Sequence, residues 1–189
     1  MDSNRCVGPS HPEGETLLHT DRLYSGRIID LDRLQVQLPN GRVTNREVVR
    51  HPGAVAVLAE PSPDHLLLVR QYRTAPNCFL WELPAGKLEA GEDPTSAAMR
   101  ELLEETGYAA QSVHLIHDFY TSPGFADERI WLFRADSLLP SQQKLDEDEF
   151  LAVSIFPREE ILRFLEHGEL QDAKTLVGIY AWLAMRRDE

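Results

Sequence analysis

The chain has 189 residues, of which 42% are hydrophobic and 26% are charged, and its formal net charge at pH 7 is −12. This length can bury one sizeable core, with room for a small additional lobe. The acidic balance argues against non-specific binding to nucleic acid, which needs a basic surface, so an anionic substrate would need locally placed cations.

Two further features bear on location. The longest purely apolar run, residues 54–59, is far shorter than the roughly 20 residues of a membrane span, so we expect no membrane association. Residues 1–16 are polar, lack the apolar segment of a secretory signal, and are expected to form a flexible tail. Cys6 and Cys78 fit no metal-ligand spacing, and reduced thiols in a cytoplasmic protein are the expectation.

The N-terminal part, residues 17–50, is expected to form antiparallel strands. Leu34 and Val36 alternate with polar residues, and Asn40-Gly41 is a strong signal for a hairpin turn. A second, compact domain is expected to occupy residues 51–189.

Strands and helices follow one another in this second part. Apolar runs predict buried strands at 54–59 and 66–70, separated by a turn rich in proline. The remaining expected elements are strands at 113–117, 128–135 and 150–156, and helices at 94–105, 158–167 and 172–187. Strands mixed with helices predict an α/β fold in which helices cover a mixed sheet.

The helix expected at residues 94–105 has an unusual charge arrangement. Residues suited to its ends are Asp93, Pro94 and Gly107. Glu101, Glu104 and Glu105 share one face of its last turn, where the helix dipole is already negative. Each unfavourable interaction there costs a few tenths to about 1 kcal/mol. A hard divalent cation, which takes oxygen ligands, would compensate for this repulsion.

Residues 86–108 read GKLEAGEDPTSAAMRELLEETGY and resemble the Nudix box, G-x5-E-x7-R-E-U-x-E-E-x-G-U, in which U is a bulky apolar residue. Only Tyr108 departs, an aromatic residue where Ile, Leu or Val is usual, which should affect packing and not chemistry. The resemblance covers roughly residues 50–187. It implies a Nudix α/β/α sandwich and hydrolysis of a nucleoside diphosphate derivative.

The resemblance also implies a metal site. Mg²⁺, with Mn²⁺ as an alternative, would be bound by Glu101, Glu105 and the backbone carbonyl of Ala85 in a turn at residues 83–86. Glu104 would complete a second site and counts among the catalytic residues. Magnesium prefers oxygen ligands and keeps several waters, so few carboxylates suffice.

Arg100 would be a catalytic orienting residue that pairs with Glu92. Two simpler interpretations stay open: Arg100 as a surface residue, and Glu92 as a charge that complements the helix start. We favour a pair that braces the loop against the helix behind the metal ligands.

Flanking segments resemble the ADP-ribose pyrophosphatase subgroup. Pro123, sixteen residues after Gly107, lies in a Ser-Pro-Gly turn of the kind that marks this subgroup, although an ordinary tight turn has the same composition. The other similar segments are 38–41, 46–53, 69–73 and 81–86. The implied reaction yields AMP and ribose 5-phosphate from ADP-ribose. Another nucleoside diphosphate sugar such as GDP-mannose is one alternative, and a non-catalytic regulator that binds ADP-ribose is a second.

In that subgroup the N-terminal segment packs across a two-fold axis and helps to build the partner's site. We therefore expect a homodimer in which residues 17–50 contribute to the substrate pocket. The cations expected to hold the diphosphate or ribose are Arg73, Arg46, Arg27 and Arg70. Arg73 is preferred because it precedes the box loop and a guanidinium can bind two phosphate oxygens, but a solvated surface position is the alternative for each arginine.

The remaining substrate contacts are less defined. Glu82 could accept a hydrogen bond from a ribose hydroxyl or form a buried structural pair, and Pro123 would line the substrate site. The aromatic residues that could stack on adenine, or simply pack in the core, are Tyr24, Tyr72 and Phe125.

A general base is expected in the acidic run at residues 146–149. In the subgroup a glutamate in a mobile loop, just before a strand that contains phenylalanine, deprotonates the attacking water. That position falls on Glu149, with Glu147 as the second choice. A solvated acidic loop without catalytic function is the alternative.

Overall fold

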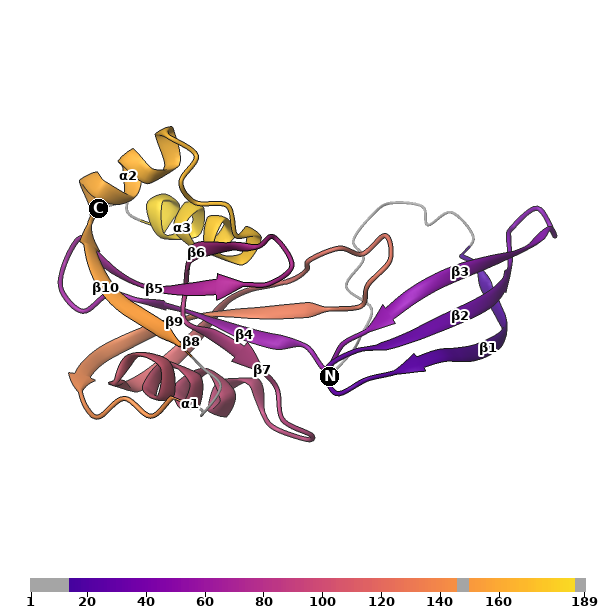
Figure 1. Cartoon of the computed structure of the whole chain (residues 1–189), viewed down its shortest axis with the longest axis horizontal. Helices are drawn as coiled ribbons and strands as arrows, with labels where there is room; N and C mark the ends of the chain where they lie inside the picture. The colour runs from indigo at the N-terminus through magenta and orange to yellow at the C-terminus, as the bar shows by residue number, and fades with distance from the viewer. Residues whose placement is uncertain (1–13, 146–149, 186–189) are drawn as a thin grey trace. The chain divides into compact units, whose positions relative to one another are not determined.

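The computed structural model of the protein describes residues 14–145 and 150–185. The chain divides into two compact units, whose elements are labelled in Figure 1. The N-terminal unit is the chain up to His51 together with Gly124–Ala126, and the core unit is Pro52–Pro123 together with the chain from Asp127 onward. In the described part of the chain, no helix is long and apolar enough to cross a membrane.

The N-terminal unit is an antiparallel sheet of three strands in the order β1-β2-β3, as predicted. The strands are β1 (Thr16–Ser25), β2 (Asp30–Gln37) and β3 (Val43–Arg50). The predicted hairpin turn joins β2 to β3, and Gly41 adopts a φ of 81°, which glycine reaches without steric cost. The Leu38 N–H closes the turn with a 2.8 Å hydrogen bond to the Arg42 carbonyl.

This sheet has almost no core of its own. Among residues 14–51 and 124–126, only Asp32 and Val36 are buried. The Asp32 carboxylate accepts hydrogen bonds from Arg22 and Arg50, and these bonds lower its pKa from the ordinary value. Large apolar side chains are instead exposed: Leu17, Leu18, Leu23, Tyr24, Ile28, Ile29 and Val43.

The core unit contains two sheets and three helices. One sheet has the order β7-β4-β9-β8 and the other has the order β10-β5-β6; β4 and β9 are parallel, and the other pairs are antiparallel, which confirms the mixed character. The strands are β4 (Ala54–Ala59), β5 (His65–Arg73), β6 (Cys78–Glu82), β7 (Ala85–Lys87), β8 (Tyr108–Tyr120), β9 (Arg129–Pro140) and β10 (Leu151–Pro157). The helices are α1 (Pro94–Thr106), α2 (Arg158–Glu166) and α3 (Ala173–Met185).

Strand β4 shows why this unit is a three-layer sandwich. All six of its residues are buried, and successive side chains of a strand point to opposite faces. Val55 and Val57 join a cluster with Ala97 and Leu102 of α1. Ala54, Ala56 and Leu58 belong to the other cluster, which holds residues of α2 and α3.

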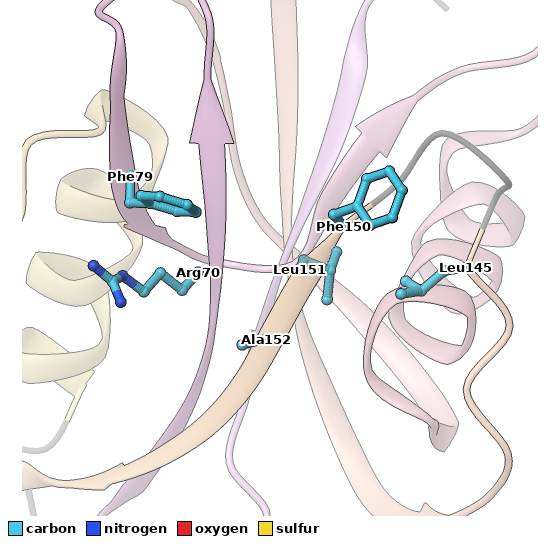
Figure 2. A pocket seen from close by; sticks show the side chains of 6 residues that line it. All are labelled: Arg70, Phe79, Leu145, Phe150, Leu151 and Ala152. Carbon is cyan, nitrogen blue, oxygen red and sulfur yellow. The ribbon is translucent and has the colours of Figure 1, made fainter.

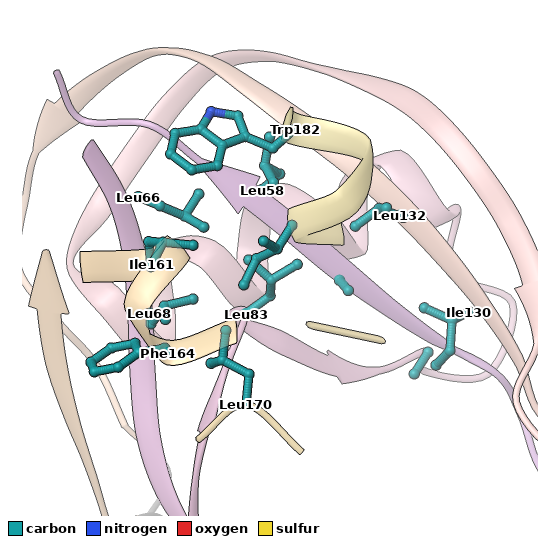
Figure 3. Packing of buried hydrophobic residues seen from close by; sticks show 13 residues of the cluster. Leu58, Leu66, Leu68, Leu83, Ile130, Leu132, Ile161, Phe164, Leu170 and Trp182 are labelled. Atoms are coloured by element: carbon teal, nitrogen blue, oxygen red, sulfur yellow. The ribbon is translucent and has the colours of Figure 1, made fainter. Parts of the chain in front are cut away.

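The figures show the two layers of helices. In Figure 1, α1 lies below the strands of the core unit, and α2 and α3 lie above them. Figure 3 shows Ile161, Phe164 and Trp182 of these upper helices packed over Leu58 and Leu66 of the strands. The predicted α/β/α arrangement is therefore observed.

Several strands differ from the sequence prediction. β6 and β7 were not predicted, and residues 83–86, expected as a turn, enter strand β7 at Ala85. β7 forms because its backbone pairs with β4, a tertiary interaction that a three-residue sequence cannot reveal. β8 and β9 extend beyond 113–117 and 128–135 because they pair with each other along nearly their whole length.

Candidate active site

Helix α1 ends as its sequence predicts. The Asp93 side chain caps its N-terminus by accepting hydrogen bonds from the backbone N–H groups of Thr95 (3.0 Å) and Ser96 (3.2 Å). Gly107 ends it in the left-handed conformation, with a φ of 72°. Tyr108, the one departure from the Nudix box, packs against the apolar cluster that α1 shares with β4.

The three glutamates lie together on the last turns of α1. Glu101 and Glu105 are buried, whereas Glu104 is partly exposed. A Cβ atom built on Gly86 of β7 would lie only 1.9 Å from the Glu101 carboxylate carbon. A larger residue there would displace the Glu101 carboxylate, so Gly86 allows the strand to pass directly over that carboxylate where it stands.

The backbone of β7 is directed toward the same carboxylates. The Ala85 N–H donates a 2.9 Å hydrogen bond to Glu105 Oε2, while the carbonyl of Pro84 accepts from Val57 of β4 on the opposite edge. Because the N–H and C=O of one strand residue point to the same edge, the Ala85 carbonyl is directed away from β4 and toward α1.

Arg100 forms ion pairs with three acidic side chains. Its Nε and Nη2 atoms each lie 2.9 Å from one oxygen of Glu92, the pairing that the resemblance implied. Its Nη1 atom binds Glu101 Oε1 at 2.9 Å and Glu104 Oε2 at 3.0 Å. The hydrogen bonds from Arg100 lower the pKa of Glu92, and the same contacts raise the pKa of Arg100. One guanidinium therefore braces the loop before α1 against two of the three glutamates.

The C-terminal end of α1 is also capped by a segment far away in the sequence. The Ser141 N–H donates to the Gly107 carbonyl at 2.6 Å, and the Lys144 N–H donates to the Glu104 carbonyl at 3.0 Å. The side-chain amide of Gln143 donates to the Glu105 carbonyl. These donors meet the negative end of the helix dipole, next to the carboxylates. Sequence reasoning missed them, because nothing local marks residues 141–144 as a cap.

A second charged group lies at the edge of the β5–β6 sheet. Arg73 binds both oxygens of Glu82, through Nε and Nη2, at 2.7 Å each. Glu82 is buried and also pairs with Lys174 of α3, which in turn lies 3.0 Å from Asp172 Oδ2. Burial alone would raise the pKa of Glu82, but the hydrogen bonds from Arg73 and the charge of Lys174 bring it below its ordinary value. Glu82 thus forms a buried structural pair, and Lys174 was missed from the sequence.

Arg70 is in a different environment from Arg73. Side chains alternate along β5, so the two arginines point to opposite faces of the sheet, and Arg73 is on the face of α1.

Aromatic side chains surround Arg70. Its guanidinium stacks over the Phe79 ring, 4.9 Å from the ring centroid, and over the Trp81 ring, 5.9 Å from the centroid. It lines a shallow depression of about 360 Å³ whose other side carries Phe150 and Leu145 (Figure 2). Tyr72 packs edge-on against Phe79, with ring centroids 5.3 Å apart.

The other predicted site residues are distributed as follows. Arg27, Arg46, Tyr24 and Phe125 belong to the N-terminal unit, where Arg46 Nη2 lies 2.5 Å from Glu15 Oε1. Pro123 belongs to the core unit, in the turn after Thr121. Glu147 and Glu149 lie outside the described residues. The structure thus brings together Arg100 with the glutamates of α1 and Ala85, and, at the sheet edge, Arg73 with Glu82.

The residues on α1 suit a hard divalent cation by their chemistry. Three carboxylates and one directed carbonyl supply the oxygen ligands that Mg²⁺ prefers, and Gly86 leaves room for a close approach. Within residues 14–145 and 150–185, no group of three acidic, histidine or cysteine side chains is already spaced to hold a metal. Glu101 and Glu104 bind Arg100, and Glu105 binds the Ala85 N–H, so a cation would replace some of these contacts.

Strands between two layers of helices form an α/β/α sandwich, and the acidic end of α1 under Gly86 of β7 is a site suited to a divalent cation. The chain belongs to the Nudix family, since the NUDIX domain matches residues 49–177, and it is a Nudix pyrophosphohydrolase. Enzymes of this family generally use divalent metal ions.

Individual relatives are similar over most of the chain. An ADP-ribose pyrophosphatase of Bacillus subtilis (strain 168) is 46% identical over 167 residues, which cover 87% of this chain and 90% of the relative. A protein of Bacillus methanolicus named methanol dehydrogenase activator is 42% identical with the same coverage. A crystal structure described as an ADP compounds hydrolase has a TM-score of 0.82 and covers 95% of this chain and 98% of its own. At 20% identity it supports the fold alone.

Proposed function

We propose that the protein hydrolyses the pyrophosphate bond of ADP-ribose in the presence of Mg²⁺ and releases AMP and ribose 5-phosphate. The observation that carries this proposal is the acidic face of α1, with Glu101 and Glu105 buried under Gly86 and Arg100 braced by Glu92. The name of the Bacillus subtilis relative supports ADP-ribose as the substrate.

The ligands for the cation would be Glu101, Glu104, Glu105 and the Ala85 carbonyl. Bound there, Mg²⁺ would neutralise phosphate charge and activate a water molecule. Mn²⁺ could take the same oxygen ligands. On metal binding, Glu101 and Glu104 would release the Nη1 atom of Arg100 and bind the cation. The two hydrogen bonds to Glu92 would keep Arg100 in place during this change.

Arg73 is the best-supported residue for holding the diphosphate. Glu82 fixes its Nε and Nη2 atoms, while Nη1 has no hydrogen-bond partner among the described residues. The hydrogen bonds to Glu82, together with the charges of Glu82 and Glu105, raise the pKa of Arg73. A preoriented guanidinium would bind phosphate oxygens with little loss of side-chain entropy.

The general base is assigned to Glu149, with Glu147 as the second choice. Glu149→Gln tests this assignment, since a general base lost in this way lowers kcat by about 10²–10⁴ while KM stays close to wild type. A near-wild-type rate would move the function to Glu147 or to a glutamate of α1.

A homodimer is part of the proposal. The N-terminal unit exposes a large set of apolar side chains, and a second copy would bury them. Arg27 and Arg46 would then contribute to substrate binding across the dimer. Pro123 would line the substrate site, and Arg70 remains a candidate contact. We also propose a cytoplasmic location, in keeping with the free thiol of Cys78.

Turnover and product analysis on a panel of nucleoside diphosphate sugars, with and without EDTA, tests the proposal. We expect AMP and ribose 5-phosphate from ADP-ribose and no turnover with EDTA. Faster hydrolysis of GDP-mannose would identify the alternative substrate class. Binding of ADP-ribose without any turnover would instead support a non-catalytic regulator. The Bacillus methanolicus relative is named as an activator of another enzyme, which is a regulatory function.

A further inference from the structure

Thr175, in the first turn of α3, is a completely buried polar residue that the chemistry described above does not use. Its hydroxyl oxygen accepts a 2.8 Å hydrogen bond from the Leu83 N–H. The same hydroxyl donates to Asp172 Oδ2 at 2.6 Å, and Asp172 also accepts from the Thr175 N–H at 3.0 Å. Asp172 therefore fixes the direction of the hydroxyl hydrogen, which leaves a lone pair for Leu83.

Leu83 lies between the two parts of the site. The residue before it, Glu82, holds Arg73 at the sheet edge, and Ala85, two residues after it, contacts Glu105. Pro84 has no N–H, so the stretch from 83 to 85 has only two backbone donors. One donor binds Thr175 of α3 and the other binds Glu105 of α1, and this short segment is therefore fixed from both helical layers.

Packing limits the same segment. A Cβ atom on Gly178, three residues after Thr175, would lie 2.4 Å from Leu83 Cδ1, so α3 lies directly against the Leu83 side chain. Leu83 itself is completely buried. Its N–H cannot turn to water if the Thr175 hydroxyl is removed, and a buried donor without a partner is costly, so the segment would shift or open.

We infer that Thr175 is a positioning residue for hydrolysis, whose hydroxyl holds residues 82–85 so that Arg73 and the Ala85 carbonyl keep their places relative to Glu105. This inference rests on the proposed function for its kinetic consequence. It adds α3, which lies outside the Nudix box, to the elements that determine the rate.

Three variants test the inference. Thr175→Val keeps the shape and removes the hydroxyl, and Thr175→Ser keeps the hydroxyl and removes the methyl group. Ile161→Val is the control, because Ile161 is as completely buried as Thr175 and belongs to the apolar cluster that contains Leu83, but the change removes only a methyl group and no hydrogen bond to Leu83. Thr175→Ala replaces the valine variant in every assay if the valine variant does not fold.

The first measurement is amide hydrogen exchange at Leu83 and Ala85, without substrate or metal. We expect exchange at both amides to be at least about tenfold faster in Thr175→Val, with β4 amides unchanged, and to be close to wild type in Thr175→Ser and Ile161→Val. The second measurement is steady-state hydrolysis of ADP-ribose with Mg²⁺. We expect kcat of Thr175→Val to fall by about 10–100-fold with KM within about threefold, the size typical for residues that orient ligands, and Thr175→Ser to restore it.

Wild-type exchange at Leu83 in Thr175→Val, or a kcat no lower than that of Ile161→Val, would overturn the inference. If the wild-type enzyme does not hydrolyse ADP-ribose at all, the proposed substrate is wrong, and the exchange measurement still decides whether Thr175 positions the segment.

Discussion

The N-terminal unit and the core unit are both rich in strands, but the strands are buried to very different extents in the two units. In the core unit every residue of β4 is buried. In the N-terminal unit nine of the ten residues of β1 are exposed, and the tenth is only partly covered. Because a small sheet needs a packed face for stability, the core unit can support a site by itself, whereas the N-terminal unit needs a further surface.

Their polar contacts differ in the same way. The ion pairs of the N-terminal unit join mostly exposed side chains, such as Arg33 with Asp21, and exposed pairs contribute about 0–1 kcal/mol. In the core unit Glu82 and Glu105 are both buried; Glu82 binds Arg73, and Glu105 accepts a hydrogen bond from the Ala85 N–H. We therefore expect the polar contacts of the core unit to position the residues of the site, and those of the N-terminal unit mainly to hold strands in register.

The largest expected effect comes from Glu105→Gln in the core unit. The amide oxygen can still accept from the Ala85 N–H, so the fold should persist, but the charge that a cation needs is lost. We expect kcat to fall by about 10²–10³-fold. Asp32→Asn, the same change at a buried carboxylate of the N-terminal unit, is the control, and we expect it to alter stability more than kcat. Equal loss of kcat in both variants would contradict the contrast between the units.

A second effect concerns assembly. Leu17→Asp/Leu18→Asp places charge among the exposed apolar residues of the N-terminal unit, and we expect the dimer dissociation constant to rise at least about 100-fold, because unpaired charge in an interface is costly. Sedimentation measures this directly. Leu139→Asp is matched in exposure, 59% against 56% for Leu17, and lies in the core unit. If the wild type is monomeric, or if Leu139→Asp dissociates the dimer and the N-terminal variant does not, the N-terminal unit is not the interface.

The charged pair at Glu82 should make stability depend on pH. The pKa of Glu82 is lowered on folding, so its contribution is complete above the ordinary value of about 4.5 and is lost as the pH falls through the folded-state pKa. Urea unfolding should show Glu82→Gln to be about 1–3 kcal/mol less stable than wild type at pH 7, since Arg73 and Lys174 lose a partner. The difference should shrink below pH 4.5. A difference that stays constant or grows in acid would contradict this assignment.

The smallest effects compare single polar contacts. Asp93→Ala removes the N-cap of α1 and should cost about 1 kcal/mol, or about 2–4 °C in Tm. Ser25→Ala removes a 2.7 Å hydrogen bond to Asp30 on the exposed N-terminal sheet and should change stability by less than about 0.5 kcal/mol. Calorimetry on both variants measures the contrast, and the reverse order would show that exposure is a poor guide here.

The sequence predicted features that depend on local chemistry. Asp93 and Gly107 mark the ends of α1, and the apolar run at 54–59 marks a strand that is buried on both faces. It could not predict β7, which forms by pairing with β4, nor the contact between Thr175 and Leu83, which are 92 residues apart. For Glu82 the sequence left two interpretations open, and only the fold shows Arg73 and Lys174 on either side of it.

Metal binding by the acidic face of α1 can be measured without substrate. Electron paramagnetic resonance can follow a Mn²⁺ titration of the wild-type protein and of Glu101→Gln/Glu105→Gln, with folding of the variant checked by circular dichroism. We predict saturable binding by the wild type, competition by Mg²⁺, and at least about 100-fold weaker binding by the folded double variant. Equal affinity in both proteins would show that the cation binds elsewhere and that the carboxylates of α1 are not its ligands.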